Sequence, residues 1–106
     1  MFFELRLYRT KPGQRDQWVK FMEEVIIPFQ ISKGMVVSGS FTGQQEEDLF
    51  VWMRRFESEE ERAKLYEAVY QSDEWKNEIA PKVEQMLYRE KIKVIRLEPT
   101  PKSVIR

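Results

Sequence analysis

The chain has 106 residues, which is enough for one domain with a single modest core. Its 18 basic and 18 acidic residues cancel, so the net charge gives no indication of a nucleic-acid partner. Histidine and cysteine are both absent, which excludes histidine-based catalytic triads, thiolate nucleophiles, disulfides and metal sites built on these side chains. No apolar run approaches the roughly 20 residues of a membrane span, and no export signal follows Met1. We therefore expect a cytoplasmic protein with no contact to a membrane.

The first segment, Phe2 to Thr10, alternates apolar and polar side chains as a strand does. One row is apolar and consists of Phe3, Leu5 and Leu7. The other row is polar and consists of Glu4, Arg6 and Tyr8. Because the two rows lie on opposite faces of the strand, the sequence raises the question of what the polar row contacts.

A helix is predicted after Lys11-Pro12-Gly13, because proline is well suited to the start of a helix. The residues that follow carry an apolar stripe at steps of three and four: Trp18, Phe21, Met22, Val25, Ile26 and Phe29. This stripe predicts packing on a sheet, and lining of a pocket is the alternative. Pro28 is expected to kink or end the helix, and Gly34 marks the latest position for its end.

A hairpin is predicted next. Residues 35–42, MVVSGSFT, have the pattern of a strand that Gly39 interrupts as a bulge or at a close approach of another backbone. Residues 43–48 form a polar connection, and residues 49–56, LFVWMRRF, form the second arm, rich in side chains that strands favour.

The last third of the chain predicts helices and one more strand. Ser58 and Glu61 have the spacing of a capping box, which starts a helix that runs to about Tyr70. Helical spacing resumes from Trp75, and Pro81 favours two short helical pieces over one straight rod. Residues 88–98 predict a strand whose many charges are typical of a sheet edge.

This order of elements is typical of an α+β fold, the ferredoxin-like βαββαβ sandwich, in which helices cover one face of a four-stranded antiparallel sheet. In that topology the first and third strands are central. The second face of the sheet stays bare, and a chain of this size is not expected to leave so much apolar strand surface in water. We therefore expect a homodimer in which two such faces meet.

Three stretches carry a resemblance to a known family: ELRLYRTKPG at the start, FESEEER followed by SDEW in the middle, and LEPTPKS near the end. Through them the chain resembles the NIPSNAP family within the dimeric α+β barrel proteins, as a single domain over residues 1–106. The resemblance implies a ferredoxin-like protomer, a homodimer whose two sheets form a barrel, and a pocket in each protomer. It implies no particular reaction, since the wider superfamily includes cofactor-free oxygenases, small-molecule isomerases and haem proteins. The strand before the capping box commonly carries a histidine, as in HLWRY, whereas the matching stretch VWMRRF has Trp52 and Arg54.

If the first and third strands are neighbours, the polar row shares a face with Trp52, Arg54 and Phe56. One hypothesis makes this face a pocket for a small organic acid or carbonyl compound. In it Arg6 and Arg54 hold a carboxylate, phosphate or enolate oxygen, and Trp52 and Phe56 form apolar walls. Tyr8 then donates a hydrogen bond, and Glu4 is the candidate base for isomerase or cofactor-free oxygenase chemistry.

A second hypothesis makes the protein a non-catalytic structural or interaction module that acts as a dimer or a higher assembly. Glu4 then pairs with Arg6 or Arg54, and the pairs fix the register of a dimer interface. We expect no metal and no cofactor, and haem ranks low because its usual histidine ligand is missing.

Overall fold

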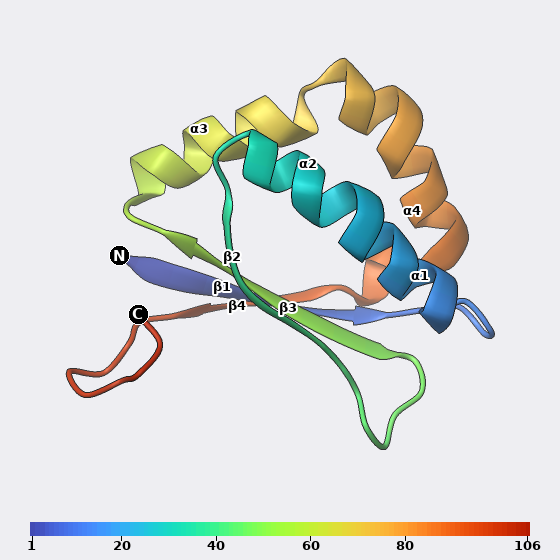
Figure 1. Cartoon of the computed structure of the whole chain (residues 1–106), viewed down its shortest axis with the longest axis horizontal. Coiled ribbons are helices and arrows are strands. Elements are labelled where there is room, and N and C mark those ends of the chain that lie inside the picture. Colours follow the sequence, from blue (N-terminus) through green and yellow to red (C-terminus); the bar gives the residue numbers. More distant parts are fainter.

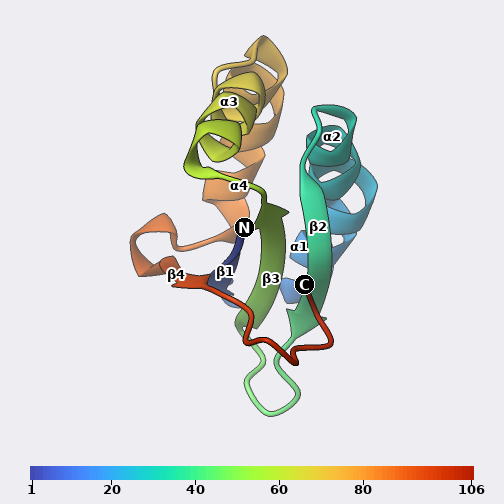
Figure 2. The same cartoon turned by 90° about the vertical axis from the view of Figure 1, so that its left-hand side faces the viewer.

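The computed structural model describes residues 1–106, and its four strands form one antiparallel sheet with helices on a single face (Figures 1 and 2). The order across the sheet is β2-β3-β1-β4, so the predicted central position of the first and third strands is confirmed. The predicted ferredoxin-like α+β fold is confirmed with it. The strands are β1 (Phe2–Arg9), β2 (Val36–Thr42), β3 (Leu49–Phe56) and β4 (Lys93–Leu97).

The first helical arm continues past Pro28. It consists of α1 (Arg15–Phe21), a π-helical turn (Met22–Ile26) and α2 (Ile27–Ser32). Pro28 lies in the first turn of α2 and does not end the arm, because the wider π turn before it moves away the carbonyl that the proline ring would otherwise meet. The arm ends at Ser32, and Gly34 follows its last turn with a φ of 106°, which favours glycine.

The second helical arm begins with α3 (Glu59–Tyr70), and the side chain of Ser58 caps it by accepting a hydrogen bond of 3.1 Å from the Glu61 N–H. A second π turn (Trp75–Ile79) leads into α4 (Ala80–Met86), so the predicted division near Pro81 is confirmed. A 3₁₀ turn (Arg89–Lys91) then precedes β4. The last strand is therefore shorter than the predicted range of residues 88–98.

The hairpin of β2 and β3 agrees with its prediction. The pairing shifts register between Val37 and Gly39, which is the irregularity that the glycine predicts. The two helical arms pack above this hairpin and β1, and the main apolar core lies between them and the sheet. None of the helices is long and apolar enough to span a membrane.

The other face of the sheet carries no helix (Figure 2). Four large apolar side chains of this open face remain exposed: Val36, Phe41, Ile95 and Leu97. The residues after β4 cross from the β4 side toward β2 and border a hollow with Phe3 and Met53. The C-terminal segment thus covers one part of the open face and leaves the rest bare.

Candidate functional site

The pairing of β1 with β3 decides where the polar row lies. Glu4 stands opposite Arg54, Arg6 opposite Trp52, and Tyr8 opposite Phe50. The two predicted rows therefore share a face. That face lies beneath the helices, since the Glu4 carboxylate accepts a hydrogen bond from Tyr66 of α3 and the ring of Tyr8 packs against Trp18 of α1. The polar row is enclosed by the protomer itself and does not belong to the open face.

Glu4 is fully buried at the centre of a charged network. Its Oε1 accepts hydrogen bonds from Arg54 Nη2, at 3.0 Å, and from the Tyr66 hydroxyl, and its Oε2 accepts from Arg62 Nε. Arg6 Nη1 approaches the same carboxylate only to 4.0 Å. The Glu4 carboxylate thus faces three arginines, of which Arg62 has a second acid in Glu59 at 3.5 Å and Arg6 is the least closely paired.

The buried Arg54 guanidinium fixes β3 to both helical arms. Its Nη1 donates to Gln30 Oε1 of α2 and to the Tyr70 hydroxyl of α3, each at 2.9 Å. Its Nη2 donates to the Tyr66 hydroxyl at 2.6 Å as well as to Glu4. Arg54 thus has partners on a strand and on two helices, which is the arrangement that a buried charge requires.

This environment sets the ionisation of the carboxyl and the phenols. Burial alone would raise the pKa of Glu4, but hydrogen bonds from Tyr66 and Arg62 and the charge of Arg54 outweigh it and lower the pKa below its ordinary value. Burial raises the pKa of Tyr66 to about 12, against the charge of Arg54. Burial also raises the pKa of Tyr8, which Arg6 opposes. Near neutral pH the site therefore holds a charged Glu4 and neutral phenols.

We expect acid to destabilise the protein through Glu4. The lowered pKa means that the folded state favours the carboxylate, so its contribution is complete above the ordinary value of 4.5 and is lost as the pH falls through the folded pKa. Urea unfolding followed from pH 7 to pH 3 should show a falling free energy of unfolding, with a smaller fall in Glu4→Gln. An equally steep fall in that variant would assign the acid sensitivity to other groups.

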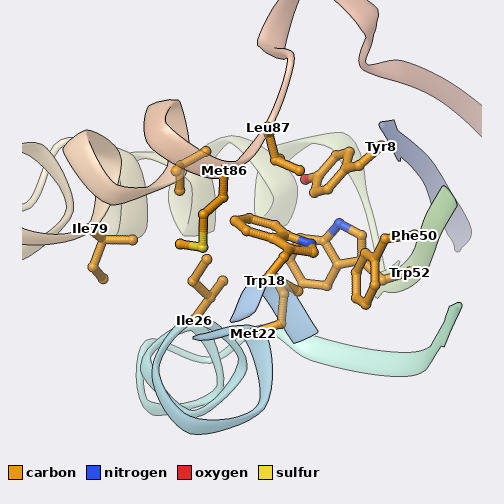
Figure 3. Packing of buried hydrophobic residues seen from close by; sticks show 10 residues of the cluster. Tyr8, Trp18, Met22, Ile26, Phe50, Trp52, Ile79, Met86 and Leu87 are labelled. Atoms are coloured by element: carbon orange, nitrogen blue, oxygen red, sulfur yellow. The ribbon is translucent and has the colours of Figure 1, made fainter. Parts of the chain in front are cut away.

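Beside this network lies a cavity of about 560 Å³ between the sheet and the helices. Arg6, Tyr8 and Trp52 reach it from the sheet, and helical side chains complete its wall. Figure 3 shows the rings of Tyr8, Trp18 and Trp52 together in this region, and Tyr8 meets both indoles edge to face. All three tryptophans of the chain, including Trp75, border the cavity.

The wall of the cavity is rich in hydrogen-bond donors and poor in acceptors. Twelve of its 15 residues are hydrophobic, the other three are Arg6, Lys76 and Arg89, and no carboxylate lines it. Arg6 Nε donates to the Tyr8 hydroxyl at 2.8 Å, so the two side chains are held together. The indole N–H groups of Trp18 and Trp52 are buried without an acceptor in the protein. A complementary molecule would be apolar with an acceptor or anionic group.

The six residues that the sequence predicted for a site divide into two groups. Arg6, Tyr8 and Trp52 line the cavity. The others lie beside it: Glu4 and Arg54 in the ion-pair network, and Phe56 in a separate apolar cluster with Met35 and Val69. Glu4 has neither access to the cavity nor a free oxygen, and this geometry does not suit a base. No group of three or more potential ligands is arranged to hold a metal ion.

Sequence reasoning missed the contribution of α3. Arg62, Tyr66 and Tyr70 are spaced four residues apart, which places them on one face of the helix. That face is directed at the sheet. The Arg62 guanidinium and the two hydroxyl groups join the charged network, and both tyrosines also line the cavity. The four-residue spacing was visible in the sequence, but it did not show that this face packs against the sheet.

The fold and the cavity define a class: a ferredoxin-like α+β protein with an apolar, donor-rich cavity between its sheet and its helices. The NIPSNAP family matches residues 3–103, and the chain therefore belongs to the NIPSNAP family. No curated protein matches it.

Solved structures agree with this assignment of the fold. A NIPSNAP family protein with unknown function from Agrobacterium tumefaciens is 23% identical, with a TM-score of 0.89 over 100% of this chain and 94% of that chain. An uncharacterized NIPSNAP domain protein from Burkholderia xenovorans is 18% identical, with a TM-score of 0.83 over 96% and 97%. A structure described as antibiotic biosynthesis monooxygenase is 16% identical, with a TM-score of 0.67 over 95% and 100%.

Proposed function

We propose that the protein is a homodimer that binds a small organic acid or carbonyl compound in the cavity of each protomer. One observation carries the proposal: Arg6 presents a poorly neutralised charge to an apolar cavity that contains no carboxylate. A largely buried charge whose anionic neighbour is 4.0 Å away and shared with two other arginines is unfavourable, and a bound carboxylate or enolate oxygen would reduce that cost.

Tyr8 complements Arg6 in this proposal. Its hydroxyl accepts a hydrogen bond from Arg6 Nε, so the phenolic proton remains available for an oxygen of the ligand. Arg6 and Tyr8 together suit a carboxylate, or a carbonyl whose oxygen gains negative charge as an enolate forms. The aromatic wall that includes Trp52 would hold the apolar body of the ligand.

The geometry also limits the chemistry. Because Glu4 lies outside the cavity, we give it the role of positioning Arg54 and Arg62, and any proton transfer in the cavity would rest on Tyr8. Isomerase or cofactor-free oxygenase chemistry would need a proton acceptor in addition, because a neutral phenol can donate a proton but cannot accept one. The likeness to the monooxygenase-type structure is one of fold. The competing hypothesis of a non-catalytic module expects side chains to fill the space that the cavity occupies.

The experiment uses the intrinsic fluorescence of the three tryptophans, all of which border the cavity. Phenylacetate, phenylpyruvate and cyclohexanone are titrated as an acid, a keto acid and a neutral carbonyl compound, and thermal melts are recorded in parallel. A ligand at 100 times its Kd should stabilise the fold by about 2.7 kcal/mol. Arg6→Met should weaken binding of the acids about 10- to 100-fold, since it removes a charge-assisted hydrogen bond.

Arg9→Met is the matched control, because Arg9 lies on the same strand but pairs with Glu46 and Asp48 at the surface. It should bind the acids as the wild type does, and both variants should keep the oligomeric mass of the wild type. Absence of binding by every probe would refute the proposed site and favour the non-catalytic module. Dissociation of Arg6→Met into smaller species would show instead that the arginine supports the assembly.

A further inference from the structure

The cations of the cavity wall are divided between its interior and its solvent side. Arg6 lies inside, with 17% of its side chain exposed. Lys76 and Arg89 are exposed residues and border the cavity from the second π turn and from the 3₁₀ turn before β4. Lys76 has no ion-pair partner, and Arg89 pairs with Glu84 at 3.0 Å on the surface. Two basic side chains therefore border the cavity on its solvent side, Lys76 without an acidic partner and Arg89 with one that a ligand anion would have to replace.

We call the solvent side of the cavity, bordered by Lys76 and Arg89, the rim. The segment that begins at Arg89 carries further basic side chains. Residues 89–96 contain four basic side chains and a single acidic one, Glu90, and Ile92 of this segment reaches the cavity wall. Arg96 is neutralised by Glu59 at 2.6 Å, whereas Lys91 stacks on the ring of Tyr88 at 4.5 Å and pairs with no acid. The 89–96 segment is thus basic although the whole chain has no net charge, whereas the stretch around Lys76 also carries Asp73, Glu74 and Glu78.

We propose that the ligand is a dianion: an organic acid with a second anionic group at the far end of its apolar body. This inference rests on the proposed function, in which Arg6 holds the first carboxylate. Lys76 and Arg89 would then hold the second group at the rim. The second contact is exposed to water, so it adds selectivity for diacids while Arg6 and the aromatic wall supply most of the affinity.

Straight-chain α,ω-dicarboxylates of six to ten carbons test the inference, each compared with its own monomethyl ester. The pair has the same dicarboxylate chain and differs by one charge and one methyl group. A diacid also has two equivalent ends, which alone give a twofold advantage. At low salt we expect the best diacid to bind about five- to tenfold more tightly than its half-ester, with the advantage shrinking at high salt.

Variants separate the two cation sites. Lys76→Met and Arg89→Met should each reduce the preference for the diacid and leave binding of the half-ester within twofold. Lys64→Met, an exposed lysine of α3 away from the cavity, should leave both unchanged. Arg6→Met should weaken the diacid and the half-ester alike.

The outcomes distinguish this inference from the proposed function. Equal binding of diacid and half-ester, within the statistical factor, overturns the inference and leaves the proposed acid site standing. Equal loss of both ligands in Lys76→Met also overturns it, because the rim would then act on the first carboxylate. If no acid of the series binds and the aromatic acids fail as well, the proposed function falls together with the inference.

Discussion

Glu4→Gln should destabilise the protein by about 3–5 kcal/mol, since it removes the one buried negative charge of the network and leaves Arg54 without a counter-ion. Arg54 is fully buried and cannot turn toward water, and glutamine cannot neutralise it. Urea unfolding at pH 7, followed by far-ultraviolet circular dichroism, measures the effect directly.

Glu84→Gln provides the control for this substitution, because Glu84 forms an ion pair with Arg89 while 63% of its side chain is exposed. Its loss should cost less than about 1 kcal/mol. Arg54→Met in the Glu4→Gln background should cost less than the sum of the two single changes, since the second change removes the charge that the first left unpaired. A Glu4→Gln protein as stable as the control would contradict the network described here.

Ile95→Glu should convert the proposed homodimer into monomers at micromolar concentration. Ile95 lies on the open face of the sheet, with 46% of its surface exposed in the isolated chain, and stands opposite Leu5. A carboxylate between two facing apolar sheets would be desolvated without a partner. Sedimentation velocity of the wild type and the variant at the same concentrations gives the result.

Ile31→Glu is the matched control on α2, where Ile31 is 53% exposed and distant from the open face. This control should sediment as the wild type does. Circular dichroism should show that both variants are folded. A wild-type protein that sediments as a compact monomer would contradict the dimer, and with it the expectation that a second chain covers the open face.

The fold was predictable because its signals are local. The alternation in β1, the stripe from Trp18 to Phe29 and the cap at Ser58 each indicate one element, and their order indicates the topology. Pro28 was predictable only in part. A proline within a helical pattern predicts a kink or an end, and the sequence does not show that a π turn before the proline lets the helix continue.

The site was predictable only in part, for a related reason. The two-residue period placed Arg6, Tyr8 and Trp52 on one face, but it does not give the register, which sets Glu4 opposite Arg54. The two-residue period also does not show how deeply each side chain is buried. Glu4 resembled a base as long as its neighbours were unknown, and the helix that supplies Tyr66 and Arg62 made it a fixed counter-ion.

The contacts of Glu4 have a consequence for partly folded states. Its three hydrogen-bond partners lie 50, 58 and 62 positions away along the chain, on β3 and α3. A fragment that contains only β1 and the first helical arm would lack these partners. In such a fragment Arg6 would not be held in its position beside the cavity. The proposed ligand recognition should therefore be an all-or-none property that appears only when both halves of the chain have docked.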